Sequence, residues 1–151
     1  MKQKLWVRGD LDGFFGLFID NLLQLMFIQS LCIFICGFPI DMVVGKILPG
    51  AALSILIGNA FYSWQAWKLM KETGRDDITA LPYGINTPSL IAYIFFVMGP
   101  VYRESGDADL AWKVGLVACF LSGVIEMIGS FVGDYLRRVI PKAALLSALG
   151  A

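Results

Sequence analysis

Four long apolar windows dominate this sequence, at about residues 14–36, 47–70, 78–102 and 110–135. A helix needs about 20 mostly apolar residues to cross a bilayer, and each window meets or approaches that length. Hydrophobic residues make up 58% of the chain and charged residues 16%, with a mean hydropathy of +0.71. Soluble domains carry about 25% charged residues. We therefore expect an all-α polytopic membrane protein.

The connections between the windows are short and rich in turn residues. Gly37-Phe38-Pro39 follows the first window, residues 73–77 follow the second and residues 103–107 the third. No soluble domain fits between them, so residues 1–151 form a single transmembrane region. A fifth apolar run starts at Ala143 and is too short to cross by Ala151. We interpret it as the start of a fifth span, in a fragment, a truncated product or one piece of a split protein.

Lysine and arginine are distributed unevenly over the two sides that four spans define. If the N-terminus is cytoplasmic, nine of them lie inside and three outside. The inside set is Lys2, Lys4, Arg8, Lys68, Lys71, Arg75, Arg137, Arg138 and Lys142, and the outside set is Lys46, Arg103 and Lys113. Cytoplasmic loops carry the excess of positive charge, so this distribution predicts a cytoplasmic N-terminus in the plasma (inner) membrane.

The charged and reactive residues argue against several classes of function. Twelve basic residues balance twelve acidic ones, so no global field favours a nucleic-acid partner. Histidine is absent, and the three cysteines lie in apolar stretches, where they are expected to pack. We expect no metal site, no cofactor and no enzymatic activity, since the sequence shows neither metal-ligand spacing nor a nucleophile with its base.

The third window is interrupted at Pro82-Tyr83-Gly84-Ile85-Asn86-Thr87-Pro88. Each proline lacks an amide hydrogen, and glycine is a poor helix former. Thr87 and Pro88 suit the N-cap and first position of a new helix. A helix from Pro88 to Gly99 rises about 18 Å, so its start is expected near the membrane midplane. Residues 78–86 would enter the membrane in extended form.

Non-helical backbone at membrane depth is tolerated only where it is buried in protein or lines a cavity. Broken helices in transporters direct their positive N-termini at the substrate. We therefore expect the backbone amides near Thr87 to Leu90 to bind a polar or anionic ligand. The alternative is a proline-kinked helix that binds nothing.

Polar residues inside the other windows are further candidates. Gln24 is either a ligand or an interhelical hydrogen-bond partner. Asp20 is either a coupling group or an interfacial residue that is solvated or paired with Arg8. Glu126 lies among small residues and is either a proton-coupling carboxyl or a structural partner of a donor. The second window carries a stripe of small and polar residues, expected to serve helix packing: Ala51, Ser54, Gly58, Asn59, Tyr62 and Ser63.

Three stretches carry a resemblance to a known family: RGDLDGFFGLFIDNLLQLM, ALPYGINTPS and IPKAALLSALGA. They resemble the xanthine/uracil permeases, nucleobase:cation symporters whose fold is shared by sulfate-type anion transporters. The resemblance implies a fold of two inverted repeats of seven segments, of which this chain holds the first four and the start of the fifth. It also implies that the third segment is a short strand followed by a half-helix, facing its counterpart in the tenth segment.

The resemblance implies a substrate site around the break. Its residues would be Gln24 on the first helix, Tyr83, Gly84, Ile85 and Asn86 in the strand and turn, and Thr87, Pro88 and Ser89 at the half-helix start. The implied solute is nucleobase-like (purine, pyrimidine or xanthine), coupled to a proton or sodium ion. The family's main coupling carboxylates lie in the eighth and tenth segments. No histidine follows Gln24 and the turn is not serine-rich, which leaves the solute open.

Two other functions stay open at the level of sequence. One is an anion carrier of the sulfate type, which would use the same half-helix. The other is a non-transporting membrane subunit or remnant. Partners expected under these hypotheses are the lipid bilayer, a small-molecule solute, and either the remaining half of a transporter or a second copy of the chain.

Overall fold

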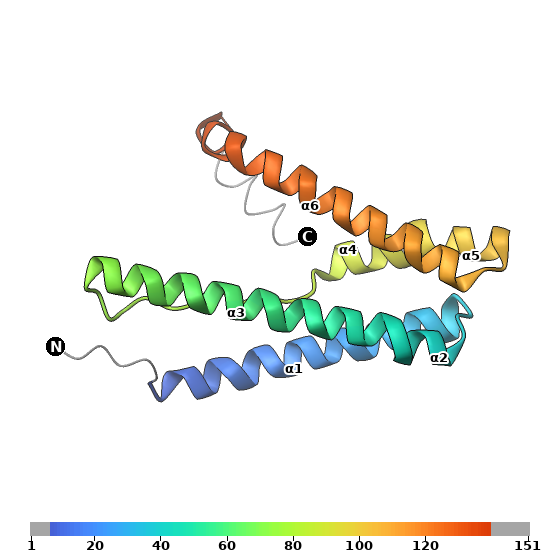
Figure 1. The fold of residues 1–151 in the computed structure, drawn as a ribbon, viewed down its shortest axis with the longest axis horizontal. Coiled ribbons are helices and arrows are strands. Elements are labelled where there is room, and N and C mark those ends of the chain that lie inside the picture. Colours follow the sequence, from blue (N-terminus) through green and yellow to red (C-terminus); the bar gives the residue numbers. More distant parts are fainter. Residues whose placement is uncertain (1–6, 140–151) are drawn as a thin grey trace.

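A computed structural model describes residues 7–139 of the chain, with side chains up to residue 133. Every regular element in that range is helical (Figure 1). The elements are α1 (Gly9–Ser30), the π-helical turn η1 (Leu31–Ile35), α2 (Ile40–Met42), the π-helical turn η2 (Val43–Ile47), α3 (Leu48–Thr73), α4 (Thr87–Ala92), the π-helical turn η3 (Tyr93–Met98), α5 (Gly99–Ser105) and α6 (Ala108–Val139).

Three of the helices are long and apolar enough to cross a membrane: Gly9–Ile35, Ile40–Thr73 and Ala108–Gly133. They coincide, within a few residues at most ends, with the first, second and fourth apolar windows. The expectation of an all-α membrane protein is confirmed at this level. The third window is not among these helices, because its first part is not helical.

Turn residues end these helices where the sequence indicates. Gly74 follows α3 and Gly106 follows α5, both with left-handed φ values of +69° and +68°, a conformation that costs glycine little. Asp107 then starts α6, since its Oδ1 accepts hydrogen bonds from the backbone N–H groups of Asp109 and Leu110 at 2.9 and 3.1 Å. The chain therefore reverses direction sharply at both turns.

The turns alternate between the two ends of the molecule (Figure 1). The start of α1 and the turn after α3 lie at one end. The turns before α2 and before α6 lie at the other. This alternation is what successive membrane crossings require. The basic residues at 137, 138 and 142 and the apolar run from 143 lie outside the side chains that the structure describes.

The buried core lies near the end where α2 and α5 meet. It is formed by ten residues from five segments: Ile28, Leu31, Cys32, Phe38, Val43, Ile47, Leu90, Ile94, Met98 and Ala111. The rings of Phe38 and Tyr102 stack there at 4.7 Å between centroids. Asp109 pairs with both Lys46 and Lys113 on the exposed rim. Away from this end, α6 diverges from the other helices (Figure 1).

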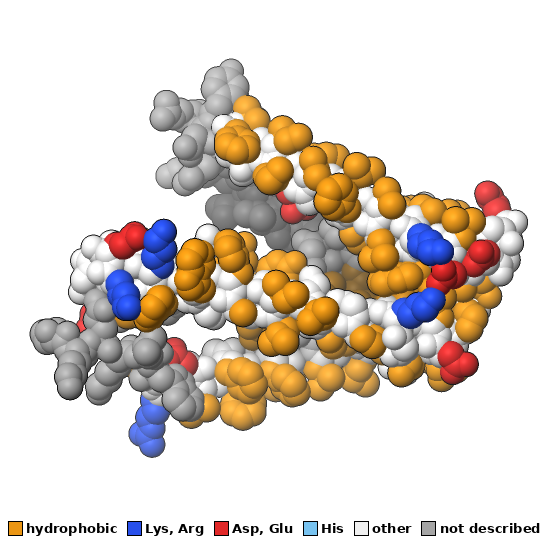
Figure 2. Space-filling view, in the orientation of Figure 1, with side chains coloured by type: hydrophobic (Ala, Val, Ile, Leu, Met, Phe, Trp, Pro, Cys, Tyr) orange, Lys and Arg blue, Asp and Glu red, His pale blue; other side chains and the backbone are white. Residues whose placement is uncertain are grey.

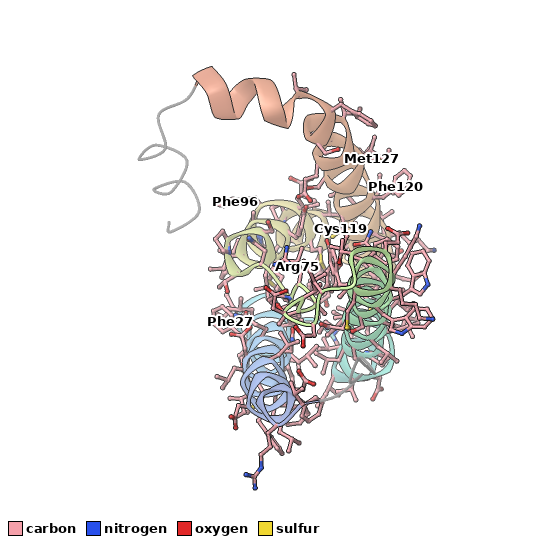
Figure 3. The ribbon with its side chains drawn as sticks, turned by 90° about the vertical axis from the view of Figure 1, so that its left-hand side faces the viewer. Phe27, Arg75, Phe96, Cys119, Phe120 and Met127 are labelled. Atoms are coloured by element: carbon pink, nitrogen blue, oxygen red, sulfur yellow. The ribbon has the colours of Figure 1, made fainter. Side chains whose placement is uncertain are left out.

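Large apolar side chains cover much of the outer surface, while charged side chains gather toward the ends (Figure 2). Phe27 and Phe96 project on one side of the molecule and Phe120 on the other (Figure 3). Phe96 is 79% exposed and Phe120 is 71% exposed. An apolar surface of this extent suits contact with lipid or with another membrane segment rather than with water.

The third segment departs from the sequence prediction in two ways. Helix starts at Thr87 and continues without interruption through Gly99 to Ser105, so the predicted half-helix ending at Gly99 is too short. Pro100 lies in the first turn of α5, directly after the π-helical turn η3, and the helix continues through it. The predicted strand is not seen between residues 7 and 139; an extended segment becomes a strand only when a second strand pairs with it.

Candidate functional site

The interruption of the third segment covers residues 74–86, which we call the break. Its last residue, Asn86, is extended (φ −79°, ψ 115°) and caps the following helix, because its Oδ1 accepts a hydrogen bond from the Ser89 N–H at 2.9 Å. The Asn86 carbonyl accepts from the Leu90 N–H at 2.9 Å. The sequence prediction of Thr87 as the cap is therefore wrong by one residue. An asparagine amide oxygen reaches the N3 amide as well as a threonine hydroxyl does.

Asn59 of α3 holds the backbone of the break at Tyr83. Asn59 Nδ2 donates to the Tyr83 carbonyl at 2.8 Å, and the Tyr83 N–H donates to Asn59 Oδ1 at 3.2 Å. Nδ2 also donates to the Ile55 carbonyl of its own helix at 2.9 Å. One side chain thus satisfies both backbone polar groups of a residue outside any helix, where water would otherwise be needed.

The Tyr83 ring lies directly on α3 at Gly58. A Cβ atom at position 58 would lie 2.2 Å from Tyr83 Cδ1, so only glycine leaves room for the ring. The Tyr83 hydroxyl is 3.5 Å from Ser54 Oγ, and the Tyr62 ring lies 6.1 Å from the Tyr83 ring. The small stripe on α3 therefore packs against the break and not only against a helix.

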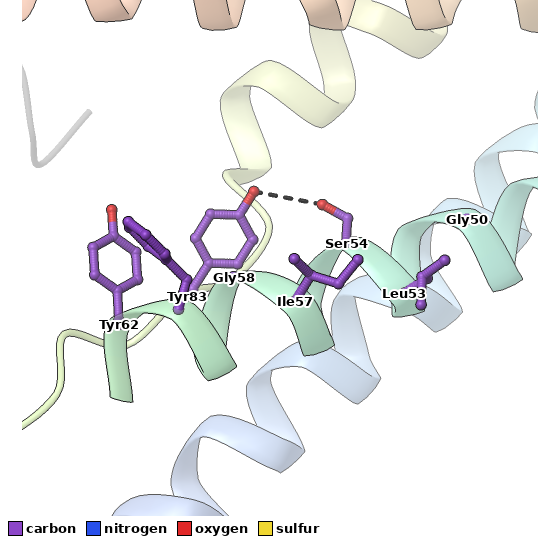
Figure 4. Close-up of a pocket in the computed structure, with 8 residues that line it drawn as sticks. Gly50, Leu53, Ser54, Ile57, Gly58, Tyr62 and Tyr83 are labelled. Carbon is purple, nitrogen blue, oxygen red and sulfur yellow. Dashed lines mark hydrogen bonds between the residues drawn. The ribbon is translucent and has the colours of Figure 1, made fainter. Parts of the chain in front are cut away.

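An open pocket of about 600 Å³ lies beside this contact (Figure 4). It is lined by Gly50, Leu53, Ser54, Ile57, Gly58, Phe61, Tyr62 and Tyr83. Its walls are aromatic and aliphatic, and its polar groups are hydroxyls. Pockets that bind small molecules have a similar volume and a similar mixture of apolar wall with a few polar groups, but they enclose most of the ligand, whereas this pocket is open on one side.

Helix α1 contacts the break from another side. Gln24 Nε2 donates to Thr87 Oγ1 at 2.7 Å. Asn21 is 6% exposed, and its Oδ1 would lie 3.1 Å from a Cβ atom at position 84, so Gly84 permits a close approach of the backbone. Asn21 Oδ1 and Gln24 Oε1 are buried acceptors for which the described side chains and backbone provide no donor. Two predicted site residues, Gln24 and Thr87, are thus in direct contact.

The end of the break, at Tyr83 to Asn86, lies close to the middle of its neighbouring helices. Gln24 is near the centre of the helical stretch Gly9–Ile35, and Asn59 is near the centre of Ile40–Thr73. Both stretches are long enough to cross a bilayer, so their centres define its mid-depth by length alone. The position of the break beside them is the one that the proline and glycine pattern predicts.

The remaining predicted substrate residues are not held by side chains of α1 or α3 in the way that Tyr83 and Thr87 are. Ile85 packs against the buried core. Pro88 is exposed in the first turn of α4, and Ser89 is partly buried with its N–H bonded to Asn86. The structure groups Gln24, Tyr83, Gly84, Asn86 and Thr87 around one segment, and leaves Ile85 as a packing residue.

The two candidate coupling carboxylates lie apart from these contacts. Asp20 is exposed, and among residues 7–133 no ion pair joins it to Arg8. Glu126 is exposed on α6, and its Oε1 accepts a hydrogen bond from Ser122 at 3.5 Å, one helical turn away. In the described part of the chain, no cluster of three metal-ligating side chains is present.

Sequence reasoning missed the importance of Asn59, Asn21 and Gly58 for the break. Each was visible only as a polar or small residue inside an apolar window. Their role depends on which face of α1 and α3 meets the break, and helical periodicity alone does not specify that. The signal that could have identified Asn59 is its position next to Gly58 in the small and polar stripe of the second window. A donor and acceptor side chain beside a glycine can bond a backbone that packs closely there.

Comparison of the chain with protein-family models, with curated proteins and with solved structures found no match.

Proposed function

We propose that this chain forms a solute-binding element of a secondary-active permease for a nucleobase-like solute, as the resemblance to xanthine/uracil permeases implies. One observation carries the proposal. Residues of α1 and α3 hold the end of the break and the helix start that follows it, through Asn59 with Tyr83 and Gln24 with Thr87. Irregular backbone at membrane depth is tolerated only where it is buried in protein or lines a cavity.

The chemistry of the surrounding side chains supports an uncharged, planar solute. The side chains that contact the break are amides, hydroxyls and aromatic rings, and the pocket beside Tyr83 has aromatic walls. A purine or pyrimidine ring presents alternating donors and acceptors at its edge and a flat face for stacking. Buried amide oxygens such as Gln24 Oε1 are acceptors for ring N–H groups once the side chain turns toward the solute.

In this proposal, the break moves as one unit with α1 and α3 when the transporter alternates between its two states. Glu126 is the proposed proton-coupling carboxyl, with Asp20 as the alternative, and sodium as the alternative ion. The remaining half of the transporter, or a second copy of the chain, supplies the facing side of the site.

The N-terminus is proposed to be cytoplasmic. In a cysteine-free background, a maleimide should therefore label Arg75→Cys from the inside and Glu104→Cys from the outside.

A binding assay on the purified chain in lipid nanodiscs tests the solute class. Labelled uracil and xanthine are expected to bind, and Thr87→Val or Gln24→Leu is expected to weaken binding about tenfold, the effect of losing one buried hydrogen bond. The matched control is Gln65→Leu on the exposed face of α3. Equal binding by all four proteins would show that the break is not the site.

A sulfate-type anion carrier is the second candidate function. The observation that favours it is the neutrality of the side chains around Tyr83 to Thr87, which leaves the helix N-terminus at Thr87 as the local positive potential. Labelled sulfate in the same nanodisc assay separates the two candidates. Binding of sulfate without competition by uracil or xanthine would replace the nucleobase proposal with the anion proposal.

A further inference from the structure

Tyr83 lies in the non-helical break, which has no partner strand among residues 7–139. The backbone N–H and C=O of Tyr83 nevertheless both have partners, and both partners belong to the side chain of Asn59. In a paired sheet, a hydrogen-bonded residue pair exchanges two such bonds through two backbones. Here a single carboxamide replaces one of the backbones.

The hydrogen-bonding groups define the orientation of the Asn59 amide. Nδ2 lies 2.9 Å from the Ile55 carbonyl and 2.8 Å from the Tyr83 carbonyl, whereas Oδ1 faces the Tyr83 N–H at 3.2 Å. The reversed amide would place its oxygen against two carbonyl oxygens and its NH₂ against an N–H. All three bonds are therefore satisfied in only one orientation.

A carboxamide is the side-chain group that can make this pair of bonds at this distance. Aspartate would accept from the Tyr83 N–H but would oppose the Tyr83 and Ile55 carbonyls with negative charge. Glycine at position 58 brings the Tyr83 ring onto the helix surface, and this contact places the Tyr83 backbone within reach of Asn59. Gly58 and Asn59 thus act on the same residue of the break.

We propose that Asn59 is a positioning residue that holds the backbone of the break in place at Tyr83, where a partner strand would otherwise be needed. The proposal rests on the proposed function in one respect: the position of Tyr83 determines where the pocket wall and the following helix start meet the solute. Asn59 itself acts through Tyr83 and is not treated as a ligand of the solute, since both N–H groups of its amide are used and its oxygen accepts from the Tyr83 N–H.

Hydrogen–deuterium exchange of the full chain in lipid nanodiscs tests the positioning role without any solute. In Asn59→Leu, exchange of the peptide covering residues 80–87 is expected to rise about tenfold, the change that loss of a buried hydrogen bond gives in an opening equilibrium. Peptides from α6 should be unchanged. Asn59→Asp should raise exchange of the same peptide, and the control Gln65→Leu should not. Unchanged exchange in Asn59→Leu would overturn the proposal.

Solute binding by the same variants separates this proposal from the proposed function. If the native chain binds uracil or xanthine, Asn59→Leu is expected to weaken binding at least as much as Thr87→Val does, and retention of native affinity would overturn the positioning role. If the native chain binds none of the solutes, the proposed function fails, and the exchange measurement still decides whether Asn59 holds Tyr83. Circular dichroism checks that each variant keeps its helices.

Discussion

Gln24 Nε2 donates a hydrogen bond of 2.7 Å to Thr87 Oγ1, across 63 positions of sequence. The bond joins the middle of the first membrane helix to the first residue of the helix that follows the break. It therefore fixes where the new helix starts relative to α1. Polar bonds between membrane helices contribute about 0.6 kcal/mol on average, so this one acts mainly through geometry.

We predict that the effects of Gln24→Leu and Thr87→Val on the free energy of unfolding do not add in the double variant. Each single substitution removes the same hydrogen bond, and the double variant loses it only once, so a coupling energy of about 0.5–1.5 kcal/mol is expected. The measurement is a double-mutant cycle on unfolding in mixed micelles. The pair Gln65→Leu and Thr87→Val is the control, and its effects should add. Strict additivity for Gln24 and Thr87 would contradict the observed bond.

Gly58→Ala is predicted to destabilise the protein by about 1–3 kcal/mol, because the new methyl group would overlap the Tyr83 ring. The higher helix propensity of alanine offsets only about 1 kcal/mol of that loss. Gly123→Ala on α6 is the matched control, since nothing lies within 4 Å of a Cβ atom there. The changes in unfolding free energy relative to the native chain, measured in micelles, should differ in sign between the two variants. Equal effects would show that Tyr83 does not pack on α3.

Asn86→Ala is predicted to cost about 1 kcal/mol of stability, the usual loss when an N-cap oxygen is removed. Asn86→Asp keeps an oxygen acceptor for the Ser89 N–H and should lose much less. Thr87→Val leaves the cap in place and should not increase amide exchange at Ser89. Faster exchange at Ser89 in Thr87→Val than in Asn86→Ala would restore Thr87 as the cap.

Asp77 provides a pH-dependent test outside the membrane helices. Hydrogen bonds from the Arg75 guanidinium, at 2.8 and 2.7 Å, lower the pKa of the Asp77 carboxyl below its usual value. Because the pKa is lower in the folded state, ionised Asp77 stabilises the folded chain at pH values above the unfolded-state pKa. This stabilisation is lost as the pH falls through the folded-state pKa. The effect should be small, because both groups are exposed.

The measurement is an NMR titration of ¹³C-labelled Asp77 in the native chain and in Arg75→Gln. The midpoint should be higher in the variant, and 1 M salt should reduce the difference. Identical midpoints would show that Arg75 does not hold Asp77 in solution.

Much of the fold follows from sequence because each membrane helix satisfies its own backbone and needs only length and apolar composition. Residues 14–36, 47–70 and 110–135 therefore correspond closely to helices in the structure. The break was also predictable, since Pro82 and Pro88 lack an amide hydrogen and Gly84 is a poor helix former. The exact cap was not, because both Asn86 and Thr87 can cap a helix and only the backbone angles select Asn86.

The partners of the break were decided by tertiary structure. Whether Gln24 faces lipid, a ligand or Thr87 depends on the rotation of α1, and whether Asn59 meets Tyr83 depends on the packing of a ring onto Gly58. Neither rotation nor packing is encoded in composition or in local periodicity. The amino-acid sequence alone therefore indicates the apolar helices and the position of the interruption. Only the folded chain determined which amide groups of α1 and α3 hold that interruption, because these contacts join residues far apart in sequence.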